Sequence, residues 1–163
     1  MRHSLPLAAL LGLLSLPALA QTAGEPVEVG DWTVSRTDNP DGSLKQCSAK
    51  VDYDDKSALT VTLMATKALF LVIYEPDLTL RAGRAYTGSY TLEGRSEVAV
   101  QALATEPTTL LVPIEDDAFM DNARVASTLT IEAAGRTIEE PLEGSDDAIT
   151  QLRECVRAGL GGI

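Results

Sequence analysis

Histidine is almost missing from this sequence of 163 residues, which contains a single one, His3. That residue lies in an N-terminal segment that we expect to be cleaved, so the mature chain contains no imidazole group. Its absence excludes Ser-His-Asp and Cys-His catalytic units, and it excludes metal sites built on histidine. The lack of histidine does not exclude enzymes that use carboxylates, lysine or tyrosine.

Basic residues are also scarce, since 13 lysines and arginines stand against 24 aspartates and glutamates, a formal net charge of −11. Nucleic-acid phosphates and anionic lipids need basic patches, so both are disfavoured as partners. The sequence has no phosphate-binding loop, dinucleotide fingerprint or zinc-ligand spacing. We therefore predict no cofactor, no metal and no nucleic acid, and the partner is left as an unidentified protein or small molecule.

Long apolar runs are confined to the N-terminus. A basic start, an apolar stretch at 5–19 and an Ala-x-Ala end are typical of a signal peptide, and we place cleavage after Ala20. The alternative is an uncleaved anchor. Gln21 stands where a lipid-anchored protein would carry cysteine, and the next apolar run, 68–74, is too short to span a bilayer. We expect a periplasmic or secreted protein without membrane insertion after cleavage.

The chain is long enough for one domain with a real core. We divide it into a signal peptide at 1–20, a flexible leader at 21–29, a single β-rich domain at 30–158 and a tail at 159–163.

Cysteine is limited to Cys47 and Cys155. Two cysteines in an exported chain most often form one disulfide, and we predict that these two are bonded. Reduced thiols or intermolecular pairing are the alternatives. A catalytic thiol is disfavoured, because no histidine is available to activate it.

Strands are predicted over most of the folded region. Apolar and polar residues alternate at 59–65, as in a strand with one buried face, whereas 68–74 is apolar on both faces, as in a central strand covered on each side. Pro107 and Pro113 are expected to make the ends of the run at 108–114 irregular. Further extended runs are predicted at 30–36, 44–51, 85–92, 95–102, 127–133 and 136–142. Short strands separated by turn signals predict a mainly β fold, an antiparallel β-sandwich or barrel-like domain.

Two short helices complete the prediction, the last one at the C-terminus. Helical spacing and acidic residues at the start mark 115–126 and 144–157. In the second helix we expect Ser145 as the N-cap and Gly159 just past the end. One buried stripe is predicted there, made of Ala148, Ile149, Leu152, Cys155 and Val156.

Three aromatic residues are candidate contacts for a ligand or partner. Trp32 is the only tryptophan, and Tyr86 and Tyr90 share one face of a strand with Gly88 between them. The alternative for all three is packing in the core.

Charged clusters are the other candidates. The acidic groups at 52–55, 115–117 and 146–147 are the kind that can bind calcium or form a carboxylate pair, but a hairpin tip and two helix starts explain them equally. Arg81 and Arg84 flank Gly83 and form a possible anion site, with a solvated rim as the alternative. No catalytic residue is assigned.

The opening Gly30-Asp31-Trp32-Thr33-Val34 of a small exported β domain resembles the invasion-associated locus B family of bacterial periplasmic proteins. The ending agrees, with a short helix, two short strands separated by Gly135, and a final helix after Gly144-Ser145. The resemblance implies a periplasmic or surface role and carries no catalysis. The chain departs from the family pattern in lacking a cysteine soon after the tryptophan and a cysteine pair before the short helix.

We therefore predict a non-enzymatic exported β domain that acts as a binding or envelope-associated protein. The alternatives are a carboxylate-dependent enzyme and an inhibitor or chaperone-like module that offers a sheet edge to its partner.

Overall fold

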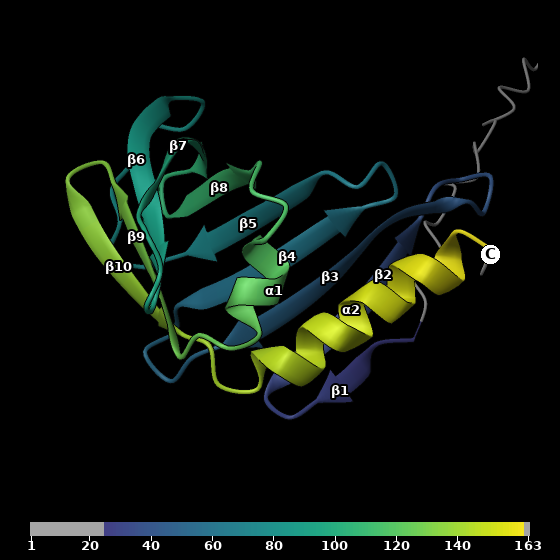
Figure 1. Ribbon diagram of the computed structural model, residues 1–163. Helices are drawn as coiled ribbons and strands as arrows, with labels where there is room; N and C mark the ends of the chain where they lie inside the picture. The colour runs from purple at the N-terminus through teal and green to yellow at the C-terminus, as the bar shows by residue number, and fades with distance from the viewer. Residues whose placement is uncertain (1–24, 162–163) are drawn as a thin grey trace, which may run out of the picture.

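One curved antiparallel sheet and two helices make up the fold in a computed structural model that describes residues 25–161 (Figure 1). The predicted signal peptide lies outside the described residues. The strands are β1 Val27–Val29, β2 Trp32–Asp38, β3 Leu44–Asp52, β4 Ala58–Met64, β5 Leu69–Tyr74, β6 Ala85–Leu92, β7 Val98–Glu106, β8 Thr109–Ile114, β9 Thr128–Ala133 and β10 Arg136–Pro141. The helices are α1 Phe119–Ala123 and α2 Ser145–Gly159.

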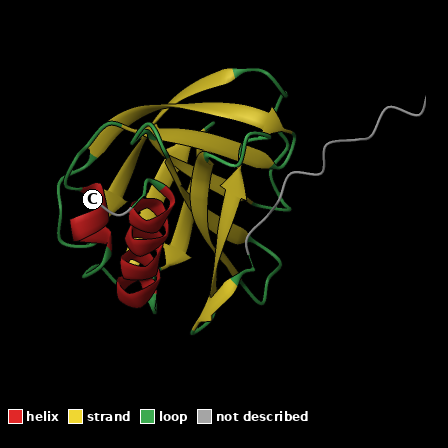
Figure 2. Ribbon diagram, turned by 90° about the vertical axis from the view of Figure 1, so that its right-hand side faces the viewer, coloured by secondary structure: helices red, strands yellow, loops and turns green. Residues whose placement is uncertain are grey.

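The strand order across the sheet is β1-β2-β3-β4-β5-β8-β7-β6-β9-β10. The predicted mainly antiparallel β class with two helices is confirmed, and the described strands form one open sheet rather than two separate ones. Strands β6, β9 and β10 run across the direction of β2 to β5, so the sheet folds over on itself around a shared core (Figures 1 and 2). Sequence neighbours pair as hairpins, whereas β5–β8 and β6–β9 join strands that are far apart in the chain.

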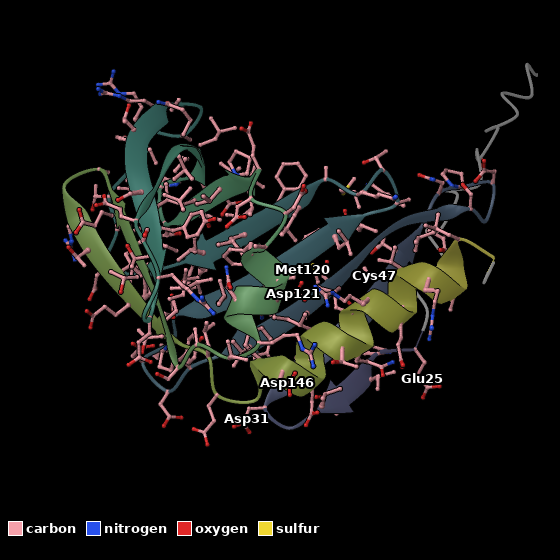
Figure 3. All side chains as sticks on the ribbon, viewed as in Figure 1. Glu25, Asp31, Cys47, Met120, Asp121 and Asp146 are labelled. Atoms are coloured by element: carbon pink, nitrogen blue, oxygen red, sulfur yellow. A yellow bond between two sulfur atoms is a disulfide. The ribbon has the colours of Figure 1, made fainter. Side chains whose placement is uncertain are left out.

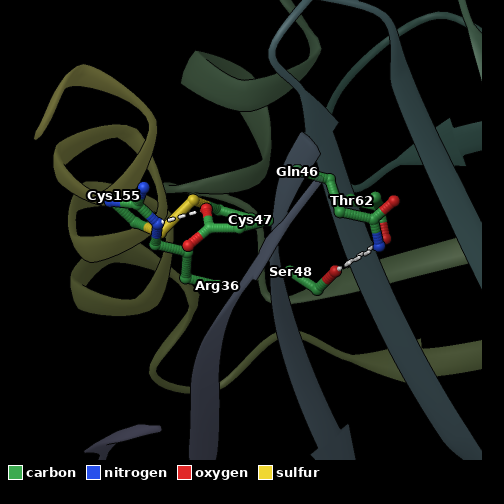
Figure 4. The surroundings of a disulfide bond; sticks show 7 residues. Arg36, Gln46, Cys47, Ser48, Thr62 and Cys155 are labelled. Carbon is green, nitrogen blue, oxygen red and sulfur yellow. Dashed lines mark hydrogen bonds and ion pairs between the residues drawn. A yellow bond between two sulfur atoms is a disulfide. The ribbon is translucent and has the colours of Figure 1, made fainter. Parts of the chain in front are cut away.

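Helix α2 packs on β2 and β3, and its predicted apolar stripe faces them. Cys155 of this stripe is bonded to the buried Cys47 of β3, and the two cysteines are 108 positions apart in the sequence (Figure 4). The predicted disulfide is therefore present in the structure. It connects the end of the chain to the first long hairpin.

The boundaries of the domain differ from the prediction at both ends. Val27–Val29 were assigned to a flexible leader, but they form β1, which pairs with β2 while the Thr33 hydroxyl donates a hydrogen bond of 2.9 Å to Glu28. Gly159 was expected past the helix end, but it is the last residue of α2. A Cβ atom at Gly159 would lie 2.8 Å from Leu44 Cδ2, so close approach to the sheet explains the glycine.

The start of α2 also differs from the prediction. The N-cap is Gly144, whose φ of 76° suits glycine, and Ser145 is the first helical residue. Ser145 is buried, and its hydroxyl donates a hydrogen bond of 2.8 Å to the carbonyl of Ala123 at the end of α1. The serine therefore connects the two helices.

The region around α1 is less helical than predicted. The helix spans five residues, because Asp116 first forms a turn in which its carboxylate accepts the Ala118 amide and its carbonyl accepts the Phe119 amide. Val125, inside the predicted helical range 115–126, lies beyond the helix and is 74 % exposed. Two exposed ion pairs connect the α1 region to α2, Arg153–Asp121 at 2.6 Å and Arg124–Asp146 at 2.5 Å. Figure 3 labels the two aspartates.

Candidate functional site

A cleft opens where the ladder between β7 and β8 ends. The register runs from Glu106 paired with Thr109 to Leu103 paired with Leu111, and it stops there within the described chain. After Leu111, the next β8 residue whose backbone faces β7 is Pro113. Pro113 pairs with Phe70 of β5 at a position where the antiparallel ladder has no hydrogen bond, so proline is tolerated on that side. On the β7 side this position would donate a backbone N–H, and proline has none. The proline thus interrupts the ladder on one side of β8 only.

The cleft has a volume of about 350 Å³ and mixed chemistry. Its lining combines apolar and neutral polar side chains with two carboxylates at the loop that follows β8, and consists of Thr87, Tyr90, Val98, Ala99, Val100, Gln101, Pro113, Glu115 and Asp116. Such a surface has room for one or two side chains of a partner or for a small organic molecule. Its charged end favours a cationic group.

Tyr90 forms one wall of this cleft. Its ring packs edge-on against Phe119 with centroids 5.3 Å apart, and its hydroxyl donates a hydrogen bond of 3.3 Å to Asp116. Burial, together with the Asp116 carboxylate, raises the pKa of Tyr90 to about 12. The phenol is therefore protonated at neutral pH, and it holds the acidic loop against β6 rather than acting as a base.

The three aromatic candidates from the sequence do not form one site. Trp32 is completely buried, and its indole N–H donates a hydrogen bond of 2.8 Å to the carbonyl of Glu143. It has no free face for a ligand, so the core alternative is correct for this residue. Tyr86 is half-buried on β6, and only Tyr90 reaches the cleft.

Arg81 and Arg84, the predicted anion site, both make contacts with Tyr86. The guanidinium of Arg84 lies over the ring of Tyr86, 5.3 Å from its centroid, and the Tyr86 hydroxyl accepts a hydrogen bond of 3.1 Å from the Arg81 amide. Cation–π contact and the tight turn account for this cluster without an anion.

The acidic clusters have structural partners. The Asp55 carboxylate accepts hydrogen bonds from the Ser57 amide and hydroxyl at the β3–β4 tip, and these bonds lower the pKa of Asp55. Asp116 forms the turn before α1, and Asp146 pairs with Arg124. Within residues 25–161, no group of three or more histidine, cysteine, aspartate or glutamate residues is placed to hold a metal ion.

One buried carboxyl group was not identified from the sequence. Glu140 of β10 is 1 % exposed, and its Oε1 has no hydrogen-bond partner among the described residues. Burial raises its pKa to about 7, and the carboxylates of Glu75 and Asp55 add to this effect. Glu140 lies on the same strand face as the buried Ile138, an alternation that the sequence already contained. Glu140 does not line the cleft.

The outer face of the sheet carries a second candidate surface. Leu71 and Ile73 of β5 are buried in the core as expected, but the opposite face of the strand is open in the described structure, so the prediction of cover on both sides was wrong. Tyr74 is 41 % exposed there, and Leu103 is 38 % exposed nearby. A hollow of about 260 Å³ on this face is lined by Gln46, Thr62, Met64, Phe70, Val72 and Leu111.

None of the described helices is long and apolar enough to cross a membrane. Together, these features define a small, mainly β domain with one disulfide and a cleft of mixed chemistry.

Comparison with known proteins supports the fold. A scan against family models and a search of curated proteins both return no match. Among solved structures, the chain is similar to the crystal structure of invasion associated protein B from Bartonella henselae, with a TM-score of 0.61 and 15 % sequence identity. The similarity covers 83 % of this chain and 99 % of that one. The fold implied by the sequence resemblance is thus confirmed, and at this identity the likeness extends to the fold alone.

Proposed function

We propose that this protein is an exported, non-enzymatic binding domain that holds a partner in the cleft between β7 and β8. The observation that carries the proposal is the interrupted ladder, which leaves a hollow inside an otherwise continuous sheet. Export is supported by the signal-like N-terminus and by the Cys47–Cys155 disulfide, because such bonds persist in oxidising compartments.

The chemistry of the cleft favours binding over catalysis. General acid–base catalysis needs a titratable group whose pKa lies near the working pH and that reaches the substrate. Tyr90 is held protonated by its environment, and the buried carboxyl group with a raised pKa, that of Glu140, does not line the cleft. Glu115 and Asp116 instead contribute acidic side chains to its lining.

An affinity capture experiment tests this proposal. The mature protein, immobilised and incubated with envelope extract of the bacterium that produces it, is expected to retain one partner in stoichiometric amount. Ala99→Trp should abolish retention, because Ala99 lies exposed on the cleft wall and an indole there fills the space. Ala158→Trp, a matched change on the exposed side of α2, should retain the partner as the wild type does.

Two outcomes contradict the proposal. One is equal retention by Ala99→Trp and the wild type, which would place the partner elsewhere. The other is turnover of a substrate by the purified wild-type protein that Ala99→Trp abolishes, which would make the cleft an active site.

A further inference from the structure

The two outer edges of the sheet are poorly suited to accept another strand. β1 has three residues, and edge strands this short offer few backbone groups. β10 presents exposed charged residues, Arg136 and Glu139, and ends at Pro141, features that discourage pairing. The interrupted ladder between β7 and β8 lacks these protections on its β7 side.

The backbone of β7 faces this cleft with alternate residues. Ala104 donates its amide to the carbonyl of Arg84, so Ala104, Ala102 and Val100 direct their backbone groups toward β6. By the same alternation, Gln101 and Ala99 direct their N–H and C=O groups away from β6. Leu103, which shares their direction, uses its groups to pair with Leu111 of β8.

At Gln101 and Ala99 this pairing has stopped, although both residues line the cleft. Their backbone groups therefore extend the hydrogen-bonding pattern of the β7–β8 ladder into an open space. An extended polypeptide is the ligand whose own N–H and C=O groups repeat with matching spacing. A small molecule would match one such pair at most.

The charge of the cleft selects among extended polypeptides. Glu115, which is exposed, and Asp116 stand at one end of the cleft, and the whole chain carries a net charge of −11. Alternate side chains of an added strand point to opposite faces, so one series meets Val98 and Val100 of the lining. A peptide with basic and apolar residues in alternation satisfies both the charge and the apolar wall.

We infer that the occupant of the cleft is an extended basic segment of a partner polypeptide, which adds as a strand along Ala99–Gln101 of β7. The inference rests on the proposed binding function and names the class of partner. The backbone groups of β7 give the segment its register, and Glu115 gives the preference for lysine or arginine.

Three synthetic peptides with capped ends probe this pairing: one alternating lysine and valine, one alternating glutamate and valine, and the lysine peptide with its lysine amides N-methylated, because in antiparallel pairing the lysine residues lie opposite Ala99 and Gln101 and direct their amides toward β7. The lysine peptide is expected to bind at least tenfold more tightly than either of the other two. Its binding should slow amide hydrogen exchange at Ala99 and Gln101, which a purely ionic contact would not do. Equal binding of the methylated and unmethylated lysine peptides would overturn strand addition.

Protein variants test the same contacts from the other side. Ala99→Pro removes the amide hydrogen that faces the cleft, so this variant should bind the lysine peptide at least tenfold more weakly than the wild type. Ala99→Val keeps the amide, and this variant should bind the peptide with wild-type affinity. Glu115→Lys should weaken binding more than Asp117→Lys, which makes the same change of net charge at an exposed residue outside the lining. Equal effects of the two lysine substitutions would overturn the role of Glu115.

Failure of this inference is distinct from failure of the proposed function. If no peptide binds while the capture experiment still recovers a partner that Ala99→Trp releases, the cleft is a binding site and the occupant is of another class. If no peptide binds and Ala99→Trp changes nothing in the capture experiment, both are wrong.

Discussion

The hydroxyl of Ser145 at the start of α2 donates a buried hydrogen bond of 2.8 Å to the carbonyl of Ala123 at the end of α1. This bond joins the final helix to the loop region that also carries Asp116 and the mouth of the cleft. Together with the disulfide at the other end of α2, it holds the helix at two points.

Replacing Ser145 with alanine is expected to lower the free energy of unfolding by about 1 kcal/mol, because the buried Ala123 carbonyl loses its donor. Urea unfolding followed by circular dichroism measures the change. Thr150→Ala, an exposed substitution in the same helix, is the control and should remain within about 0.5 kcal/mol of the wild type. Equal effects of the two substitutions would remove the role assigned to Ser145.

Replacing both cysteines with alanine is expected to lower the free energy of unfolding by about 2–5 kcal/mol, since the bond closes a long loop in the unfolded chain. Urea denaturation of the oxidised wild type and of the double variant gives the difference. Mass spectrometry of the protein purified from an oxidising compartment should find no free thiol. Detection of two free thiols would contradict the bond between Cys47 and Cys155.

Gly159→Ala is expected to destabilise the protein, although alanine is the better helix former. The added Cβ would meet Leu44 Cδ2 at 2.8 Å and Leu44 Cβ at 3.0 Å, and Leu44 is buried, so it has little room to move. Overpacking of this kind costs about 1–3 kcal/mol, which exceeds the gain of up to about 1 kcal/mol in helix propensity.

A double-mutant cycle separates these two contributions. In the background of Leu44→Ala the obstacle is removed, so Gly159→Ala should become neutral or stabilising there. Additive effects of the two substitutions would show that the contact with Leu44 is not the reason for the glycine.

Stability should decrease as the pH rises from about 4.5 to about 7, because of Glu140. Its pKa is 4.5 in the unfolded reference and about 7 in the folded protein, where burial disfavours the charged form. Between these values the unfolded chain releases a proton that the folded chain retains, so unfolding becomes easier as the pH increases. The loss is at most about 3 kcal/mol and is complete above pH 7.

Glu140→Gln should remove most of this pH dependence and unfold at higher urea concentration than the wild type at pH 8. Urea midpoints measured from pH 5 to pH 8 test both statements. Glu139→Gln, an exposed neighbour on β10, should keep the wild-type slope. A wild-type profile that is flat over this range would contradict the raised pKa.

Much of the local structure follows from the sequence. Residues 59–65 alternate between apolar and polar, and this period of two is a property of any half-buried strand. Gly94 and Gly135 each lie between two predicted strands, and both have φ above 70°, a conformation that favours glycine. The disulfide was predicted from the count of cysteines in a chain expected to be exported. These signals are local or compositional, so they are readable without knowing which strands are neighbours.

The cleft depends instead on long-range pairing. Pro113 was recognised as an irregular strand end, but its consequence arises only because β8 lies between β5 and β7 and its proline faces β7. The sequence could not show this, since the energy of strand pairing depends on contacts across the whole sheet.

Three further residues separate what the sequence indicates from what the folded structure decides: Ser145, Gly159 and Glu140. Each carries a plausible local meaning in the sequence, as a cap, a helix stop and a surface charge. Packing assigns other roles, because α1 lies beside Ser145, Leu44 lies against Gly159, and the curled sheet encloses Glu140. The sequence alone indicated most of the strands and the final helix. The roles of these three residues were decided only by their neighbours in the folded protein, because burial and steric contact are properties of the assembled core.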